Sequence, residues 1–116
     1  MHFKLIVALI NEELTDTVVD TARAAGATGA TVINHARGEG INKKTTFFGL
    51  DLEVPVDVIL FIVEEHLSRH ILETIDKAAG FDTKSGAGMA IQIDIQDAVG
   101  VAHQIHELEN VVKDKL

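Results

Sequence analysis

The order in which strand-like and helix-like segments follow one another is the feature that most narrows the fold of this chain. Residues 3–10 form a nearly continuous aliphatic run, which is typical of a strand inside a sheet. Apolar residues recur at helical spacing over residues 14–25, and Gly26 marks the end of that helix. Two further strand-like runs follow at residues 30–36 and 58–63, joined by a polar connection.

The rest of the chain repeats the pattern of helix and strand. Apolar residues of the segment 67–79 share one helical face, and Gly80 follows them as a left-handed stop. Residues 89–95 alternate apolar with more polar side chains, which predicts a strand with one more polar face. Residues 101–116 carry apolar residues at helical intervals, which predicts an amphipathic C-terminal helix. The whole order predicts a single α+β domain over residues 1–116, ferredoxin-like (βαββαβ), with that helix added.

Two glycine-rich turns are predicted to lie at the same end of the sheet. One, Gly38–Gly40, follows the strand at 30–36, and the other, Gly86–Gly88, precedes the strand at 89–95. Right-handed crossovers bring the exit of the first strand and the entrance of the second to one end. Backbone N–H groups in such turns can bind phosphate or carboxylate, although each turn alone more often only redirects the chain. Their shared position favours a ligand site.

The connection at residues 40–54 is long and polar, and loops of this kind are commonly functional or disordered. Phe47 and Phe48 within it either anchor the loop to its own core or dock on a partner, and anchoring is the more common role. Lys43 and Lys44 either neutralise a bound anion or are simply solvated.

Charge and composition exclude several classes of partner. The 116 residues include 18 acidic and 10 basic side chains, and the net charge of −8 argues against a surface that binds nucleic acid. The apolar run at residues 3–10 is too short to span a bilayer, so we do not expect the chain to be embedded in a membrane. The chain contains no cysteine, which excludes disulfides and fits the cytoplasm.

Catalytic motifs are not recognisable in the sequence, so we do not expect an enzyme. His66 with His70, and His103 with His106, have spacings at which two imidazoles could share a metal ion, but surface histidines are the more common outcome. His35 is expected to be a hydrogen-bonded core residue if its ring points inward, and only secondarily a ligand contact.

Several short segments resemble one family, the nitrogen regulatory protein PII. The run Gly26-Ala27-Thr28-Gly29-Ala30-Thr31-Val32, followed by Arg37-Gly38-Glu39-Gly40, resembles the stretch that ends the first helix of that family and opens its long T-loop. Pro55 and Gly86-Ala87-Gly88 fall in register with the same pattern. The resemblance implies a homotrimeric signal-transduction protein that binds an adenine nucleotide (ADP, AMP or ATP, the last with Mg) between subunits. It also implies a protein partner that the T-loop regulates, and a membrane transporter is one candidate.

Carried over position by position, the resemblance implies a set of nucleotide-binding residues. Ile62 would lie against the adenine, Met89 stands at a lysine position of the family, and the amides of one turn would face the phosphates: Gly86, Ala87 and Gly88. The remaining residues would line the cleft from the T-loop side: Thr31, Arg37, Gly38, Glu39 and Gly40.

The sequence also departs from the family pattern. Met89 replaces the lysine and residues 100–102 contain no arginine, so we expect ADP or AMP to compete well with ATP. Asn42 and Val56 replace the glutamine and lysine that the family uses for Mg-ATP with 2-oxoglutarate, and the chain has no tyrosine to be uridylylated. The alternative is a trimeric structural or metal-linked protein of the copper-tolerance type, which shares the fold without a nucleotide site.

Overall fold

The computed structural model describes residues 1–37, 55–84, 86–103, 105–106 and 109–110. The predicted T-loop with its paired lysines and phenylalanines, and the predicted site residues Gly38, Glu39 and Gly40, lie outside the described residues. Within the described part of the chain, no helix is both long and apolar enough to cross a membrane.

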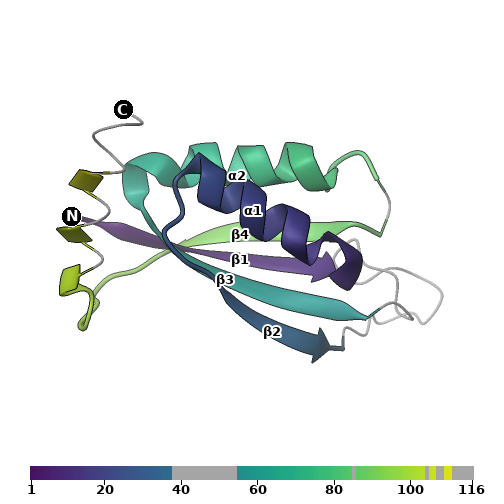
Figure 1. Ribbon diagram of the computed structural model, residues 1–116, viewed down its shortest axis with the longest axis horizontal. Coiled ribbons are helices and arrows are strands. Elements are labelled where there is room, and N and C mark those ends of the chain that lie inside the picture. The colour runs from purple at the N-terminus through teal and green to yellow at the C-terminus, as the bar shows by residue number, and fades with distance from the viewer. Residues whose placement is uncertain (38–54, 85, 104, 107–108, 111–116) are drawn as a thin grey trace.

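Helices and strands follow the predicted order (Figure 1). They are β1 (Phe3–Asn11), the single 3-10 turn η1 (Glu12–Leu14), α1 (Thr15–Ala25), β2 (Thr31–Ala36), β3 (Val56–Glu64), α2 (Glu65–Ala79) and β4 (Gly88–Asp94). These strands form a four-stranded sheet in the order β2-β3-β1-β4, in which every neighbouring pair is antiparallel. This is the strand order of a ferredoxin-like fold, so the predicted α+β class is confirmed.

Local hydrogen bonds and glycines set the ends of the helices. The Asn11 side chain accepts a hydrogen bond from the Glu13 amide at 3.0 Å, so helical structure begins where the sequence predicts it, although the first turn is the 3-10 turn η1. Gly26 ends α1 with a φ of 125°, and Gly80 ends α2 with a φ of 73°. Glycine adopts such positive φ values without a steric penalty, so both predicted stops are confirmed.

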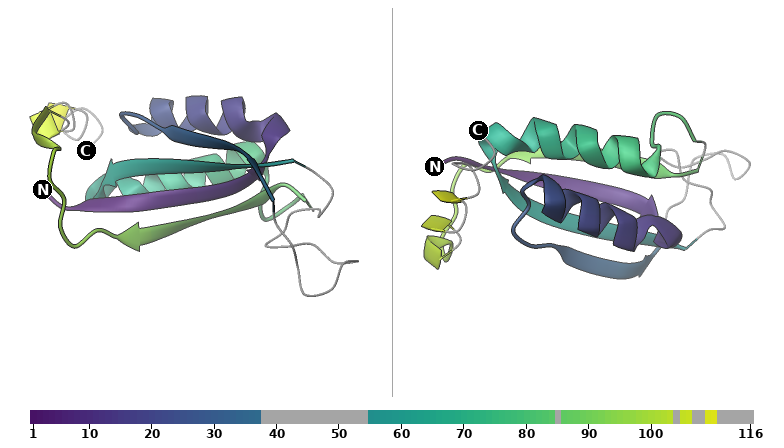
Figure 2. Two further views of the ribbon diagram at one scale, coloured as in Figure 1. Left: turned by 90° about the horizontal axis from the view of Figure 1, so that it is seen from below. Right: turned by 45° about the horizontal axis from the view of Figure 1, so that its top comes forward.

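Both helices lie on the same side of the sheet (Figure 2). Alternate residues of β1 and β3 point towards the helices and meet their apolar sides in one buried cluster. The largest contributors are Ile6, Ile10, Ile59, Phe61 and Val63 from the sheet, with Val18, Leu67, Ile71 and Ile75 from the helices. Removal of this apolar surface from water, at about 25 cal/mol per Å², is the main stabilising contribution to the fold.

The opposite side of the sheet, which we call the open face, is apolar and is not covered by the described helices. Cross-strand register places ten apolar residues there: Leu5, Val7, Leu9, Ile33, Val58, Leu60, Ile62, Met89, Ile91 and Ile93. Ile91 is 42 % exposed and Ile93 is 48 % exposed. The predicted difference between the two sides of β4 is therefore present, but the more polar side, with Ala90 and Gln92, faces the helices. The open face is thus as apolar as a protein core, although the described helices do not cover it.

The C-terminal segment is helical where it is described. Helical backbone occurs at residues 102–103, 105–106 and 109–110, and the Ile105 amide donates to the Val101 carbonyl at 2.9 Å. Figure 1 shows this segment near the N-terminus, at the end of the sheet where β1 begins. The other residues of the predicted C-terminal helix lie outside the described residues.

Candidate functional site

The ends of four strands meet on one side of the molecule, which we call the loop end. β1 and β2 finish there, and β3 and β4 begin there. The sequence therefore places the end of β2 and the turn Gly86–Gly88 correctly at one end of the sheet. They lie at opposite edges, however, because β3 and β1 stand between β2 and β4. Three strand spacings separate these edges by about 14 Å, so the end of β2 and the turn Gly86–Gly88 do not share one pocket among the described residues of a single chain.

Main-chain hydrogen bonds connect the strands at the loop end. The Asn11 amide donates to the Ala87 carbonyl at 3.2 Å, and the Glu12 amide donates to the Pro55 carbonyl at 3.1 Å. The end of β1 consequently positions both the turn before β4 and the start of β3. A ligand held by either segment would be held by a rigid part of the fold.

The turn Gly86–Gly88 is buried and contains two residues with positive φ. At Gly88 the φ is 129°, and an added Cβ would lie 2.1 Å from the Leu9 carbonyl oxygen, so close packing on β1 explains this glycine. Gly86 has a φ of 81°, and within the described residues its amide has no hydrogen-bond acceptor. This amide is therefore a candidate donor to an anionic ligand.

A buried carboxylate links three elements near the loop end. Asp57 is 4 % exposed, and its Oδ2 accepts a hydrogen bond from the Thr15 hydroxyl at 2.6 Å. Its Oδ1 accepts a hydrogen bond from the His35 amide at 3.4 Å. Asp57 therefore ties the first residue of α1 and the last residues of β2 to the start of β3.

The end of β2 contains a β-bulge. Ile33 pairs with Val58 and Ala36 pairs with Val56, so β2 has one residue more than β3 between these two pairs. His35 lies in this bulge with a φ of 60°, and it is the single non-glycine residue with positive φ among the described residues. Its side chain is exposed. The condition set for a core histidine, a ring that points inward, is therefore not met, because β2 is an edge strand that leaves the bulge open to solvent.

A cavity of about 350 Å³ lies between the start of β2 and the end of β3, and we call it the β2–β3 cavity. It is lined by Leu5, Thr28, Gly29, Ala30, Thr31, Leu60 and Ile62. The aliphatic side chains come from the open face, while the Thr31 hydroxyl and the loop before it are polar. Within the described residues neither Thr28 nor Gly29 makes a hydrogen bond, so their backbone N–H and C=O groups can bond to polar atoms at the edge of a ligand. Apolar walls with a few polar groups suit a flat heterocycle.

A second hollow of about 330 Å³, the α2–β4 groove, has a different chemistry. Gly88 and Met89 line it together with Leu72 and Phe81, and its polar residues are mostly acidic: Arg69, Glu73, Asp76 and Asp82. The hydrogen bond to Asp76, and then the negative charge of Asp76, raise the pKa of Asp82 above its ordinary value. Carboxylates that already repel one another make this groove unsuitable for phosphate.

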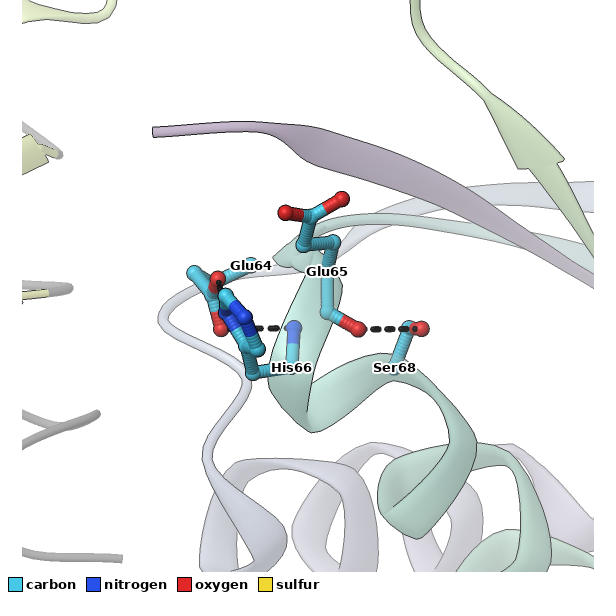
Figure 3. A network of polar contacts seen from close by, with 4 residues as sticks. All are labelled: Glu64, Glu65, His66 and Ser68. Atoms are coloured by element: carbon cyan, nitrogen blue, oxygen red, sulfur yellow. Dashed lines mark hydrogen bonds and ion pairs between the residues drawn. The ribbon is translucent and has the colours of Figure 1, made fainter. Parts of the chain in front are cut away.

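Neither of the two histidine pairs belongs together to a group of three metal-binding side chains among the described residues. The one group of three metal-binding side chains found there is Glu64, Glu65 and His66, whose ligand atoms lie within 4.8 Å of one another. Figure 3 shows that Glu64 accepts from the His66 amide, at 2.8 Å, and contacts the His66 ring through Nδ1, at 2.5 Å. Both carboxylate oxygens thus cap the start of α2, and His70 does not take part.

Comparison with known proteins identifies the family. A family model described as nitrogen regulatory protein P-II matches residues 3–104. The chain belongs to the P-II family. No curated protein sequence matches the chain.

Solved structures support the fold of this P-II family member. A candidate PII-like signaling protein from Thermus thermophilus is 24 % identical, with a TM-score of 0.60, and the match covers 82 % of this chain and 87 % of that one. CPII from Thiomonas intermedia K12, described as a nitrogen regulatory PII-like protein in its apo form, is 19 % identical with a TM-score of 0.61, covering 82 % and 92 %. A structure of CPII bound to ADP, AMP and acetate is also 19 % identical with a TM-score of 0.61, covering 83 % and 90 %.

The site residues implied by the P-II resemblance fall into separate places within one chain. Thr31 and Ile62 line the β2–β3 cavity. Gly88 and Met89 line the α2–β4 groove on the far edge of the sheet, next to the buried Gly86 and Ala87. Arg37 is exposed at the end of β2. The structure thus groups these described residues into two sets, one at each edge of the sheet.

Several features of this P-II chain were missed by the sequence reasoning. Asp57 was detectable, because it is an acidic residue within the apolar run of β3. Leu5 and Leu60 of the β2–β3 cavity looked like ordinary strand residues. The bulge at His35 left no signal, because one extra residue in a strand does not change its composition.

Proposed function

We propose that this chain is a PII-like homotrimeric signal-transduction protein, one PII-like domain over residues 1–116, that binds an adenine nucleotide between subunits and regulates a protein partner through its T-loop. The observation that carries the proposal is the β2–β3 cavity, in which Thr31 and Ile62, two residues assigned to the nucleotide in advance, lie together. Membership of the P-II family and the ADP and AMP in a structure of CPII support the choice of ligand. The proposed role is binding, and it involves no catalytic step.

The division of the site between two edges supports a cleft between subunits. One chain offers the β2–β3 cavity at one edge and the Gly86–Gly88 turn at the other. If β2 of one copy lies beside β4 of the next, the base can occupy the cavity while the amide of Gly86 meets the phosphates. Along the sheet, Thr31 is level with Val7 and Gly88 with Ile10, so the two parts are offset by three residues, or about 10 Å. An extended adenosine diphosphate can bridge such an offset.

We assign regulation of the partner to the T-loop because the chain resembles the P-II family in this segment. Arg37, Gly38, Glu39 and Gly40 at its root complete the proposed nucleotide-binding set with Ile62, Gly86, Ala87, Gly88, Met89 and Thr31. A ligand can shift the T-loop between states only if it binds one state more tightly. A membrane transporter is one class of partner that fits this role, and the cytoplasm is the compartment in which it would act.

Calorimetric titration with ADP, AMP and ATP, the last with and without Mg, tests the proposal. We expect saturable binding of at least one nucleotide at one site per chain. Gly29→Leu is the informative variant, because Gly29 lines the cavity and an added Cβ there meets nothing within 4 Å. It should therefore fold normally and lose at least about tenfold in affinity. Ala78→Leu, on the exposed side of α2, is the control and should bind like wild type. A flat titration with every nucleotide would reject the proposal.

A further inference from the structure

The bulge at the end of β2 holds a histidine in the left-handed region of backbone conformation. A φ of 60° is uncommon outside glycine, and asparagine, aspartate and histidine are the other residues found there most often. Asn34 stands immediately before His35, and Gly38 follows shortly after. A bend at this point could also be made with either of those residues, so the backbone conformation does not itself require an imidazole. The surroundings of the ring therefore decide its role.

The backbone of His35 is linked to the start of β3. Its amide donates to Asp57, which is buried and is held in turn by the Thr15 hydroxyl. The imidazole is exposed, and within the described residues it has no hydrogen-bond partner. A linked backbone that presents an exposed polar side chain suits a binding residue, because part of the entropy cost of ordering that side chain is met before the ligand arrives.

The position of His35 along β2 relates it to the β2–β3 cavity. Thr31 lines that cavity, and His35 follows four residues later on the same strand, towards the loop end. At about 3.3 Å per residue this is roughly 13 Å. A nucleotide whose base occupies the cavity and whose phosphates extend towards the loop end would bring those phosphates to the bulge.

We propose that His35 is a phosphate-binding residue of the nucleotide site, presented by the β2 bulge and anchored by Asp57. The inference rests on the proposed nucleotide function and adds to it a residue that donates a ring N–H to the diphosphate. Hydrogen bonds to charged groups are among the stronger polar contacts in proteins, so the loss of this one should be measurable.

The test compares ADP with adenosine on the full chain. His35→Asn removes the imidazole and keeps a residue that tolerates positive φ, so the bulge should persist. We expect ADP affinity to fall about tenfold and adenosine affinity to stay within twofold of wild type. His35→Gly should show the same selective loss, which separates the side chain from the backbone. His2→Asn removes an exposed histidine near the opposite end of β1 and serves as the control.

Three results would overturn the inference, and they can be told apart. If wild type binds ADP and His35→Asn binds it equally well, His35 does not contact the phosphates although the proposed function stands. Equal losses for ADP and adenosine would mean that the bulge shapes the whole cleft and that the imidazole makes no phosphate contact. If wild type binds neither compound, the proposed function fails together with this inference.

Discussion

At the scale of single residues, Gly88 has little freedom to change. It has a φ of 129° and packs against the main chain of β1, where an added Cβ would lie 2.1 Å from the Leu9 oxygen and 2.9 Å from the Ile10 Cα. We expect Gly88→Ala to lower the free energy of unfolding by more than about 2 kcal/mol, because clash and backbone strain add. Urea denaturation followed by circular dichroism measures the change.

Substitutions at two other glycines separate steric clash from backbone strain as causes of the stability loss expected at Gly88. Gly29 has neither a positive φ nor a neighbour within 4 Å of an added Cβ, so Gly29→Ala should change stability by less than about 1 kcal/mol. Gly100 has a φ of 79° in open space, so Gly100→Ala tests strain without a clash. If Gly88→Ala were no more harmful than Gly100→Ala, the predicted close approach to β1 would be refuted.

The Thr15 hydroxyl is the second residue-scale prediction. It donates to the buried Asp57 at 2.6 Å, and Thr15→Val has nearly the same shape but cannot donate. A buried carboxylate that loses a donor costs about 1–3 kcal/mol, so the free energy of unfolding should fall by that amount. Thr17→Val, at an exposed position of α1, is the control and should have little effect. Equal stability of Thr15→Val and wild type in urea would contradict the proposed anchoring role of Asp57.

At the scale of elements, the order of strands and helices along the chain was predictable. The position of each strand in the sheet, and the side of β4 that faces the helices, were not. The apolar run of β1, the helical spacing in α1 and α2, and the stops at Gly26 and Gly80 are local signals, and each appears in the structure. Which side of β4 faces the helices is decided by pairing with β1, and a strand's own alternation cannot reveal that choice. The end of β2 and the turn Gly86–Gly88 were predicted to share one end of the sheet and they do, but they lie at different edges. The β2–β3 cavity lies at the start of β2 and the end of β3, away from that end, and was not predicted.

The cap of α2 provides an element-scale prediction of pH dependence. Hydrogen bonding to Glu64, and then its negative charge, raise the pKa of His66 above the ordinary value of 6.5. Since the folded-state pKa exceeds the unfolded one, the stabilisation is fully present below pH 6.5 and is lost as the pH rises through the folded-state pKa. The urea midpoint of His66→Gln should therefore lie below that of wild type in mild acid. This difference between the two midpoints, the gap, should shrink in alkali.

His70→Gln is the matched control for the cap, because His70 lies one turn later on α2 and outside the Glu64 group. It should show no comparable dependence of the gap on pH. NMR titration of the His66 ring gives the same answer directly, as a midpoint above 6.5. A gap for His66→Gln that is constant across pH would mean that the ring does not titrate against Glu64.

At the scale of the whole molecule, the exposure of the apolar open face is not explained by the fold of a single chain. Single-chain soluble proteins rarely expose a continuous apolar sheet of this kind, and such surfaces mark contacts with other chains. Both edge strands contribute: Ile33 of β2 is 49 % exposed, and Ile93 of β4 is 48 % exposed. Three copies that turn this face inward would bury it and would also bring β2 of one copy towards β4 of the next. Assembly and nucleotide binding would then depend on the same surfaces.

Ile91→Glu tests this dependence. Ile91 is 42 % exposed in the single chain, so a charge there should leave the chain folded, whereas in a trimer it would be buried without a partner at a cost of several kcal/mol per copy. Light scattering should report a trimeric mass for wild type and a monomeric mass for Ile91→Glu, with unchanged far-UV circular dichroism. Val99→Glu, at a position 96 % exposed, should remain trimeric. Because the proposed cleft needs two chains, Ile91→Glu should also lose ADP binding; a monomeric variant that still bound ADP would place the whole site within one chain.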